Sequence, residues 1–352
     1  MSARCTHFGH CGGCTLQDIP LAAYRARKRD AIIRALTNRG FVSPDVAEPI
    51  AVPPASRRRA VFKIAKRDDL TQLGFYAQRA HVIVDMRECL VLTPALLALT
   101  PNLRQLMHGV LKSGQQAEVH VTEAENGIDV AVRATVQLKP ALVAALATAG
   151  PQMGVIRIMW NGALAFESAT PLVRFADVVV KVPPGAFLQP TRAGETALRR
   201  HVLEAMQGAR SIADLFAGCG TFALPLAAQA RVHALEKDAA MIGALLAAAK
   251  LASGLKPVTA ARRDLFKVPL SAAELGRYDA VTLDPPRAGA QAQVTQLAKS
   301  DVARIAYVSC DAASFARDAR ILHDGGYKMG TVIPVDQFLW SEHIELVTAF
   351  AR

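Results

Sequence analysis

Three cysteines lie within the first fourteen residues, and their spacing suits the binding of a metal centre. Cys5, Cys11 and Cys14 form the pattern Cys-x5-Cys-x2-Cys in a stretch that also contains three glycines. Glycine allows the backbone to wrap tightly around a small object. Closed zinc sites and iron–sulfur clusters take four protein ligands, and Cys89 can supply a fourth thiolate. The spacing does not separate zinc from a cluster, and ordinary buried cysteines are the alternative.

A fifth cysteine, Cys310, lies where it can act as a nucleophile. It follows the apolar run Arg304–Val308, which predicts a β-strand that delivers the thiol to the carboxyl end of a sheet. The last segment, DQFLWSEHIELVTAF, offers Glu345, with His343 and Glu342 beside it. A thiolate that adds to a ring carbon and a base that removes a ring proton form a known catalytic pair. The alternative for Cys310 is a small apolar core residue.

The second half of the chain supplies the elements that position these two groups. Apolar runs predict strands that alternate with helices, and four strands end in the acids Asp214, Glu236, Asp264 and Asp284. A glycine turn, Gly218–Gly220, follows the first of these strands. The pattern predicts a doubly wound, Rossmann-like α/β domain with its ligand at the carboxyl ends of the strands.

The ligand predicted for this domain is S-adenosylmethionine rather than NAD. The segment GCGTFA lacks the third glycine of the dinucleotide fingerprint. Glu236 is placed to accept hydrogen bonds from a ribose hydroxyl pair, and Asp264 from an adenine amino group. The strand end Asp284-Pro-Pro-Arg287 is typical of methyltransferases that act on nucleobases, although the amino-methylating enzymes carry an aromatic residue at the position of Arg287.

A helix and a β-rich region precede this domain. Residues 15–36 have the apolar periodicity of an amphipathic helix, with Lys28 on its basic side. From Ser56, short alternating runs separated by turn signals predict antiparallel strands, interrupted by a helix at Pro94–Lys112. Basic residues concentrate in these strands and predict a phosphate-contacting face, with a solvated sheet face as the alternative. They are Arg57, Arg58, Arg59, Lys63, Lys66, Arg67 and Arg79.

The composition agrees with a folded protein that has a polyanion as its partner. The 352 residues carry a formal net charge of +11, and 51% of them are hydrophobic against 20% charged, which excludes a wholly disordered chain. Excess positive charge indicates a nucleic acid partner or simply favours solubility. The sequence has neither a long apolar run nor a signal peptide, so we expect a soluble, cytoplasmic protein with reduced cysteines.

Nearly the whole chain resembles the RNA 5-methyluridine methyltransferases of the TrmA/RumA type. The most specific segments are CGGCTLQ, PPGAFLQPT, DLFAGCGTFALPLA, LDPPRAG, VSCDAASFARD and HIE. The resemblance implies that Cys310 is the nucleophile and Glu345 the proton acceptor. It implies a [4Fe-4S] cluster, as in the ribosomal-RNA branch of the family, at Cys5, Cys11, Cys14 and Cys89. It implies S-adenosylmethionine contacts from Gln189, Phe216, Thr221, Glu236, Asp264 and Asp284.

Three features depart from the pattern of this family. Asp311 follows the nucleophile where the family has Asn, and its charge is expected to raise the pKa of the thiol. The segment Leu339–Ser341 replaces Pro-His-Thr. Only four residues precede Cys5, so we expect no N-terminal RNA-binding β-barrel of the TRAM type. RNA binding is therefore assigned to the β-rich region, and in particular to Arg57, Arg58, Arg59 and Lys63.

We therefore predict three parts. Residues 1–55 form a cluster-binding segment and helix, residues 56–185 a β-rich α+β RNA-binding region, and residues 186–352 a class I methyltransferase domain. The predicted reaction is methylation of C5 of a flipped-out uridine in 23S rRNA. We expect the protein to be a monomer and to have no membrane partner. The alternatives are an RNA cytosine-5 methyltransferase and a non-catalytic RNA-binding protein with a degenerate methyltransferase fold, which Asp311 favours.

Overall fold

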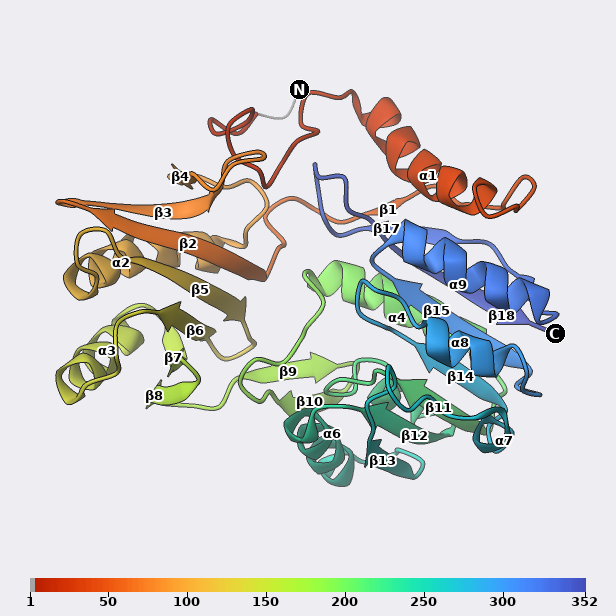
Figure 1. The fold of residues 1–352 in the computed structure, drawn as a ribbon. Coiled ribbons are helices and arrows are strands. Elements are labelled where there is room, and N and C mark those ends of the chain that lie inside the picture. The colour runs from red at the N-terminus through yellow and green to blue at the C-terminus, as the bar shows by residue number, and fades with distance from the viewer. Residues whose placement is uncertain (1–3) are drawn as a thin grey trace.

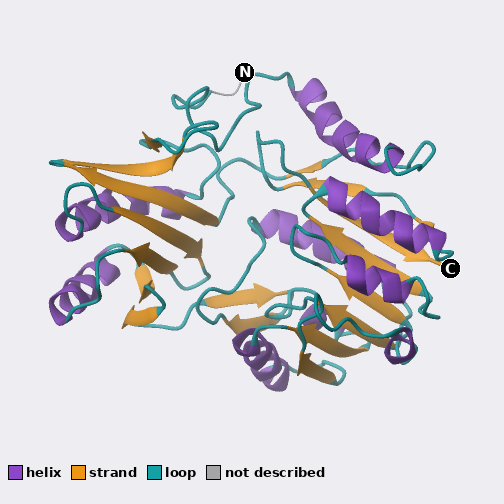
Figure 2. Cartoon of the chain, in the orientation of Figure 1, coloured by secondary structure: helices purple, strands orange, loops and turns teal. Residues whose placement is uncertain are grey.

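The computed structural model describes residues 4–352, which form two lobes with separate sheets (Figure 1). Figure 2 shows helices packed beside each of the two sheets. Among these residues, no helix is both long enough and apolar enough to cross a membrane.

The first lobe is a seven-stranded, largely antiparallel sheet with the strand order β4-β3-β2-β5-β6-β7-β8. Helices α2 (Pro94–Val110) and α3 (Pro140–Gln152) pack against it. Its strands alternate buried and more exposed residues, as expected for a sheet with one face on a core. The strands are β2 (Arg59–Arg67), β3 (Leu70–Tyr76), β4 (Ile83–Asp85), β5 (Gln116–Glu123), β6 (Ile128–Ala134), β7 (Val155–Trp160) and β8 (Ala163–Glu167).

The second lobe is a nine-stranded sheet in the order β1-β17-β18-β15-β14-β11-β12-β13, with β16 also paired to β18. The five strands from β11 to β15 are parallel, and β18 runs antiparallel to β15. The strands are β1 (Ile50–Ala51), β11 (Ser211–Leu215), β12 (Arg231–Glu236), β13 (Val258–Arg262), β14 (Ala280–Leu283), β15 (Arg304–Ser309), β16 (Lys328–Met329), β17 (Ile333–Asp336) and β18 (Glu345–Ala351).

The predicted doubly wound architecture is present in this lobe. Strands β11, β14 and β15 are buried almost throughout, because helices cover both faces of a parallel sheet. The strand order reverses between β11 and β14, and ligands of open α/β sheets bind outside the carboxyl ends at such a point. The helices are α1 (Leu21–Thr37), α4 (Arg192–Ala205), α5 (Ala223–Leu226), α6 (Ala239–Leu251), α7 (Ala272–Leu275), α8 (Gln291–Leu297) and α9 (Ala312–Asp324).

The observed division of the chain differs from the predicted boundaries at residues 55 and 185. Helix α1 packs against α9, and β1 pairs with β17, so the segment after the cysteines belongs to the second lobe. The hairpin β9 (Leu172–Phe175) and β10 (Val178–Lys181) shares a core with α6. Both segments bury their apolar residues against partners distant in the sequence, which the local pattern did not reveal.

Helix α1 also differs from its predicted pattern at Lys28. This residue was expected on the basic face, but it is 2% exposed and its Nζ lies 2.8 Å from Asp336 Oδ1. The Lys28 ammonium also donates to the carbonyl oxygens of Phe338 and His343, and Tyr24 donates to the second Asp336 oxygen. A buried charge persists when it is paired and hydrogen-bonded in this way. Lys28 therefore ties α1 to the loop that follows β17.

Candidate active site

A cavity of about 650 Å³ lies at the carboxyl edge of the second sheet, facing the first lobe. All eight residues predicted to bind the cofactor or to catalyse the reaction line it. Its volume lies in the range of small-molecule sites. These residues are Gln189, Phe216, Thr221, Glu236, Asp264, Asp284, Cys310 and Glu345.

At one end of the cavity, the Glu236 carboxylate is held by three backbone N–H groups. Gly218 donates to one carboxylate oxygen at 3.0 Å, and Lys237 and Asp238 donate to the other at 2.7 and 3.0 Å. Gly218 has a positive φ of 54°, a conformation that glycine adopts without strain. Each carboxylate oxygen has further lone pairs, so Glu236 remains able to accept hydrogen bonds from a ribose. Asp264, the second predicted acid, instead pairs with Lys237 at 3.1 Å.

Two aromatic rings stand beside these acids. The ring centroids of Phe216 and Phe266 lie 5.5 Å apart, and Phe266 is 47% exposed although its side chain is large and apolar. An exposed aromatic ring in a ligand cavity is suited to stacking on a planar base. Phe266 was missed in the sequence, although its position two residues after Asp264 was a usable signal.

At the other end, β15 and β18 bring the predicted catalytic pair together. Ser309 of β15 pairs with Leu346 of β18 in the antiparallel register. The next pair of opposed positions is therefore Cys310, directly after β15, and Glu345, the first residue of β18. Burial raises the pKa of the Cys310 thiol to about 11, and the charges of Glu345 and Asp284 add to the increase. Burial also raises the pKa of Glu345 to about 8 and that of Asp284 to about 7. A carboxyl group with a raised pKa is a stronger base than an exposed one.

Asp311 has a smaller effect on the thiol than the sequence suggested. Its charge contributes least among the effects that raise the pKa of Cys310. The carboxylate caps α9 by accepting from the backbone N–H groups of Ala313 and Ser314, and it lies 3.3 Å from Arg287 Nε. Burial alone would raise the pKa of Asp311, but the Ser314 N–H and Arg287 hold it below its usual range. Asp311 is therefore a structural cap whose charge is largely offset.

We expect Asp311→Asn to increase the rate of nucleophilic attack by Cys310 roughly two- to fivefold at pH 7, because a small contribution to the thiol pKa is removed. Asparagine caps helices about as well as aspartate, so the thermal midpoint should change little. The measurement is the pH dependence of thiol alkylation, alongside thermal unfolding. A slower reaction in the variant would contradict this account and assign a positioning role to the Asp311–Arg287 pair.

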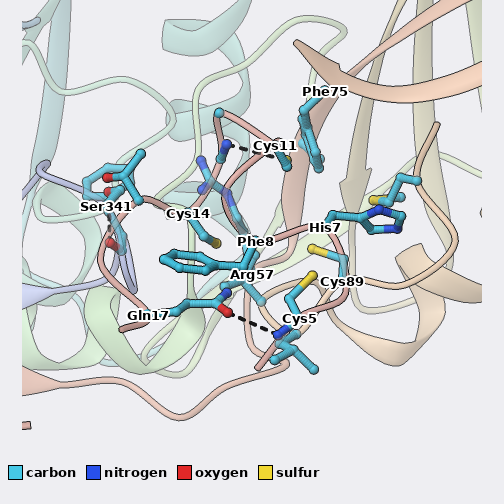
Figure 3. Close-up of a pocket in the computed structure, with 18 of the residues that line it drawn as sticks. Cys5, His7, Phe8, Cys11, Cys14, Gln17, Arg57, Phe75, Cys89 and Ser341 are labelled. Atoms are coloured by element: carbon cyan, nitrogen blue, oxygen red, sulfur yellow. Dashed lines mark hydrogen bonds between the residues drawn. The ribbon is translucent and has the colours of Figure 1, made fainter. Parts of the chain in front are cut away.

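A second cavity, of about 620 Å³, adjoins the first and is lined by Cys310 and by the four cysteines of the predicted cluster (Figure 3). Cys5, Cys11, Cys14 and Cys89 come from two segments about 75 residues apart in the chain, yet all four line this space. Burial, together with the charges of the other three thiols, raises the pKa of Cys14 to about 12. Four thiolates can persist here only with compensating positive charge, which a metal centre provides.

The four cysteine side chains do not converge on one point. Among residues 4–352, no group of three His, Cys, Asp or Glu side chains is arranged to hold a metal ion. The four thiols instead line the walls of a shared cavity. Four thiolates can bind either a structural zinc ion or a [4Fe-4S] cluster, so this donor set does not distinguish the two.

The basic residues predicted to contact RNA are largely engaged within the protein. Arg58 is 4% exposed, pairs with Glu195 at 2.6 Å and donates to the Gln189 carbonyl. Arg59 donates to the Leu188 carbonyl, and Lys63 pairs with Glu118. Arg58 is therefore removed from the set of RNA contacts, because its buried guanidinium cannot reach a phosphate. The alternating sequence pattern did not reveal that the residues at the start of β2 face the second lobe.

Arg57 has a more specific position than a phosphate contact. It lines both cavities, as do Arg287 and Cys310. Its guanidinium carbon lies 5.6 Å from the centroid of the Phe338 ring, and it faces the thiols of Cys89 and Cys14. Burial lowers its pKa, and the charges of Cys89 and Cys14 oppose that effect. Arg57 therefore supplies positive charge between Cys310 and the four cysteines of the predicted cluster.

A parallel acid-tipped sheet, a ligand cavity at its carboxyl edge and a thiol beside a buried carboxyl group define a Rossmann-like methyltransferase. The sequence model of the tRNA (uracil-5-)-methyltransferase family matches residues 172–351. An uncharacterized RNA methyltransferase of Rhizobium meliloti is 41% identical, over 99% of this chain and 85% of its own length. The chain belongs to the uracil-5 RNA methyltransferase family.

Two further proteins are similar to this chain, the first in sequence and the second in fold. The 23S rRNA (uracil(1939)-C(5))-methyltransferase RlmD of Aromatoleum aromaticum is 32% identical, over 99% of this chain and 85% of its own length. The tRNA (uracil-54, C5)-methyltransferase of Pyrococcus abyssi, solved with S-adenosyl-L-homocysteine, is similar in fold, with a TM-score of 0.73 at 22% identity. That similarity covers 97% of this chain and 86% of the other.

Proposed function

We propose that the protein uses S-adenosylmethionine to methylate C5 of a uridine in 23S rRNA. The observation that carries the proposal is that Cys310, directly after β15, and Glu345, at the start of the neighbouring β18, line the same cavity as the predicted cofactor residues. The 32% identical RlmD relative acts on 23S rRNA by its name, which favours ribosomal RNA over transfer RNA as the substrate. We further propose a monomer in the cytoplasm.

The six predicted residues form a suitable site for the methyl donor. Glu236 and Asp264 would bind its ribose and adenine, Phe216 and Phe266 would stack on the adenine, and the glycine turn would allow close approach. S-adenosylmethionine supplies the methyl group and a positively charged sulfur. The buried acids Asp284 and Glu345 favour positive charge in this part of the cavity.

Uracil C5 is too weakly nucleophilic to take a methyl group without activation. The Cys310 thiolate adds to C6 and forms a carbon–sulfur bond, and the electron pair of the C5–C6 double bond makes C5 nucleophilic. C5 attacks the methyl group, whose bond to the sulfonium sulfur breaks so that S-adenosylhomocysteine leaves. Glu345 then removes the C5 proton. The electrons of that C–H bond restore the double bond and expel the thiolate. The cavity encloses both side chains, so the target base must leave its stack to reach them.

The proposal includes a [4Fe-4S] cluster at Cys5, Cys11, Cys14 and Cys89. The proposed methyl transfer requires no electron, so the expected role is structural. The N–H groups of Thr15 and Leu16, which follow these cysteines, donate to the Trp340 carbonyl, in the loop between Phe338 and Glu345. Cys89 lies in the first lobe. A bound cluster would therefore join the first lobe to the loop that leads to the proton acceptor.

We expect anaerobically purified wild-type protein to be brown, with broad absorbance near 400 nm, and Cys89→Ser to lose most of that absorbance. RNA binding should weaken together with it. The control is Cys219→Ser, because Cys219 is buried in a separate apolar core. A colourless, zinc-containing wild type would contradict the cluster, and a folded C89S variant with unchanged RNA affinity would contradict its structural role.

The direct test of the function is mass-spectrometric mapping of 5-methyluridine in ribosomal RNA from cells with and without this protein. Loss of one 5-methyluridine from 23S rRNA supports the proposal, and loss from transfer RNA alone corrects the substrate. The alternatives give other results. Loss of 5-methylcytidine would identify a cytosine-5 methyltransferase, and an unchanged modification profile would favour a non-catalytic RNA-binding protein.

A further inference from the structure

A buried glutamine, Gln337, lies behind the catalytic cavity and joins its two ends. Its Nε2 donates to Gln189 Oε1 at 2.7 Å and to Glu345 Oε2 at 3.0 Å. Gln189 Nε2 in turn donates to Asp284 Oδ2 at 3.2 Å. Gln337 is 2% exposed, and it is not among the residues that line the cavity. It can therefore influence bound molecules only through Glu345 and Gln189.

We propose that Gln337 is a positioning residue that holds the Glu345 carboxylate and fixes the orientation of the Gln189 amide. The inference rests on the proposed function, in which Glu345 accepts the C5 proton. It adds a residue that neither the sequence patterns nor the predicted site contained.

The hydrogen-bond chain fixes the orientation of both amides. If the Gln189 amide were reversed, its oxygen would face the acceptor Asp284 and its NH₂ group would face the NH₂ group of Gln337. In the observed orientation, the Gln189 oxygen is engaged by Gln337 and the NH₂ group is directed toward Asp284. Gln189 consequently offers a donor rather than an acceptor to a molecule in the cavity.

Three elements hold Gln337 in place. Val335 of β17 pairs with Glu345 of β18, and Gln337 directly follows β17, where its backbone N–H donates to the Val335 carbonyl at 3.0 Å. The preceding residue, Asp336, is anchored by Lys28. Gly194 of α4 packs closely against Gln337, because a Cβ at Gly194 would lie 2.4 Å from Gln337 Oε1. A glycine at this position leaves the space that the glutamine side chain occupies.

The charged groups around Glu345 determine the effect of removing Gln337. Asp284 and Cys310 face Glu345 from the ends of β14 and β15. On the other elements packed against it, Glu195 of α4 is paired with Arg58, and Asp336 of β17 with Lys28. Burial raises the pKa of Glu345, the Asp284 charge adds to the increase, and the Gln337 N–H opposes it. Loss of Gln337 should raise that pKa further and free the carboxylate to rotate.

The test is Gln337→Met, which retains the length of the side chain without its donor. Turnover on a uridine-containing RNA should fall about 10- to 100-fold, as expected for loss of a buried hydrogen bond to a charged group. The pH at which turnover is half-maximal should move upward. Covalent trapping on the same RNA with 5-fluorouridine should fall less than turnover, because fluorine at C5 removes the need for a proton acceptor.

The matched control is Gln293→Met, a change at another fully buried glutamine. Gln293 lies in α8 and exchanges hydrogen bonds with the main chain of Leu270, just before α7. This control should retain the wild-type pH profile and the wild-type ratio of turnover to trapping. The inference is wrong if Q337M behaves like Q293M, or if it loses turnover and trapping equally with an unchanged pH profile. Wild type that neither methylates nor traps uridine RNA would instead contradict the proposed function.

Discussion

Replacement of Cys310 with alanine should lower methylation of the target RNA by about 10⁴-fold or more, the scale observed when a catalytic nucleophile is removed. Wild-type protein incubated with 5-fluorouridine RNA and S-adenosylmethionine should form a covalent complex that survives denaturation, and C310A should form none. We expect no adduct with C310A because, among the residues the structure describes, no other cysteine lines the cavity at the carboxyl edge of the second sheet.

The pH dependence of trapping provides an independent check on Cys310. The reactive thiolate is the minor species at neutral pH, because burial raises the pKa of Cys310 to about 11 in the free protein. The rate of thiol alkylation should therefore rise about tenfold per pH unit between pH 7 and 9. Cys219→Ala is the control, because Cys219 lies in the apolar core and should leave trapping intact. A C310A variant that still traps would identify a different nucleophile.

Glu345→Gln should convert the enzyme into a form that becomes trapped on ordinary uridine RNA. Glutamine retains the shape of the side chain but cannot accept the C5 proton, so the reaction should stop after C5 has been methylated. Turnover should fall by about 10²- to 10⁴-fold, the contribution usual for a general base. Mass spectrometry of the denatured mixture should show protein joined to RNA through Cys310, with one added methyl group.

The neighbouring carboxylate provides a matched control for this experiment. Glu342 is exposed, pairs with Arg27 at 2.5 Å and has no contact with the proposed proton transfer. Glu342→Gln should retain turnover and accumulate no adduct. If E345Q turns over normally, or loses turnover without any trapped methylated RNA, then Glu345 is not the proton acceptor.

The catalytic half of the site was predictable because its residues sit at the ends of locally patterned strands. The acid-tipped apolar runs indicated a parallel sheet, and parallel strands bring their carboxyl ends to one edge. For that reason, Glu236, Asp264 and Asp284 were predicted to meet, and they line one cavity. The position of Cys310 at the end of β15 followed from the same pattern.

The remaining features depend on contacts between distant segments. Arg58 and Lys28 carry the charge that marks a surface in sequence, but each is buried against a carboxylate more than 130 residues away. Gln337 shows no motif, and its role depends on Gln189, 148 residues earlier in the chain. Residue type and the local hydrophobic pattern do not predict such pairings, because the tertiary packing determines which polar side chains form hydrogen bonds or ion pairs.

The arrangement of β17 and β18 also determines when the site can form during protein synthesis. Strand β18 lies between β15 and β17 in the sheet, and β1 has its partner only in β17. The ribosome makes the cysteine segment, α1 and β1 hundreds of residues before these strands. Those early segments must wait without their partners while the first lobe can already fold from contacts closer in sequence. The nascent chain therefore gains Glu345, the proposed proton acceptor, and the anchor for its cysteine segment in the same late step.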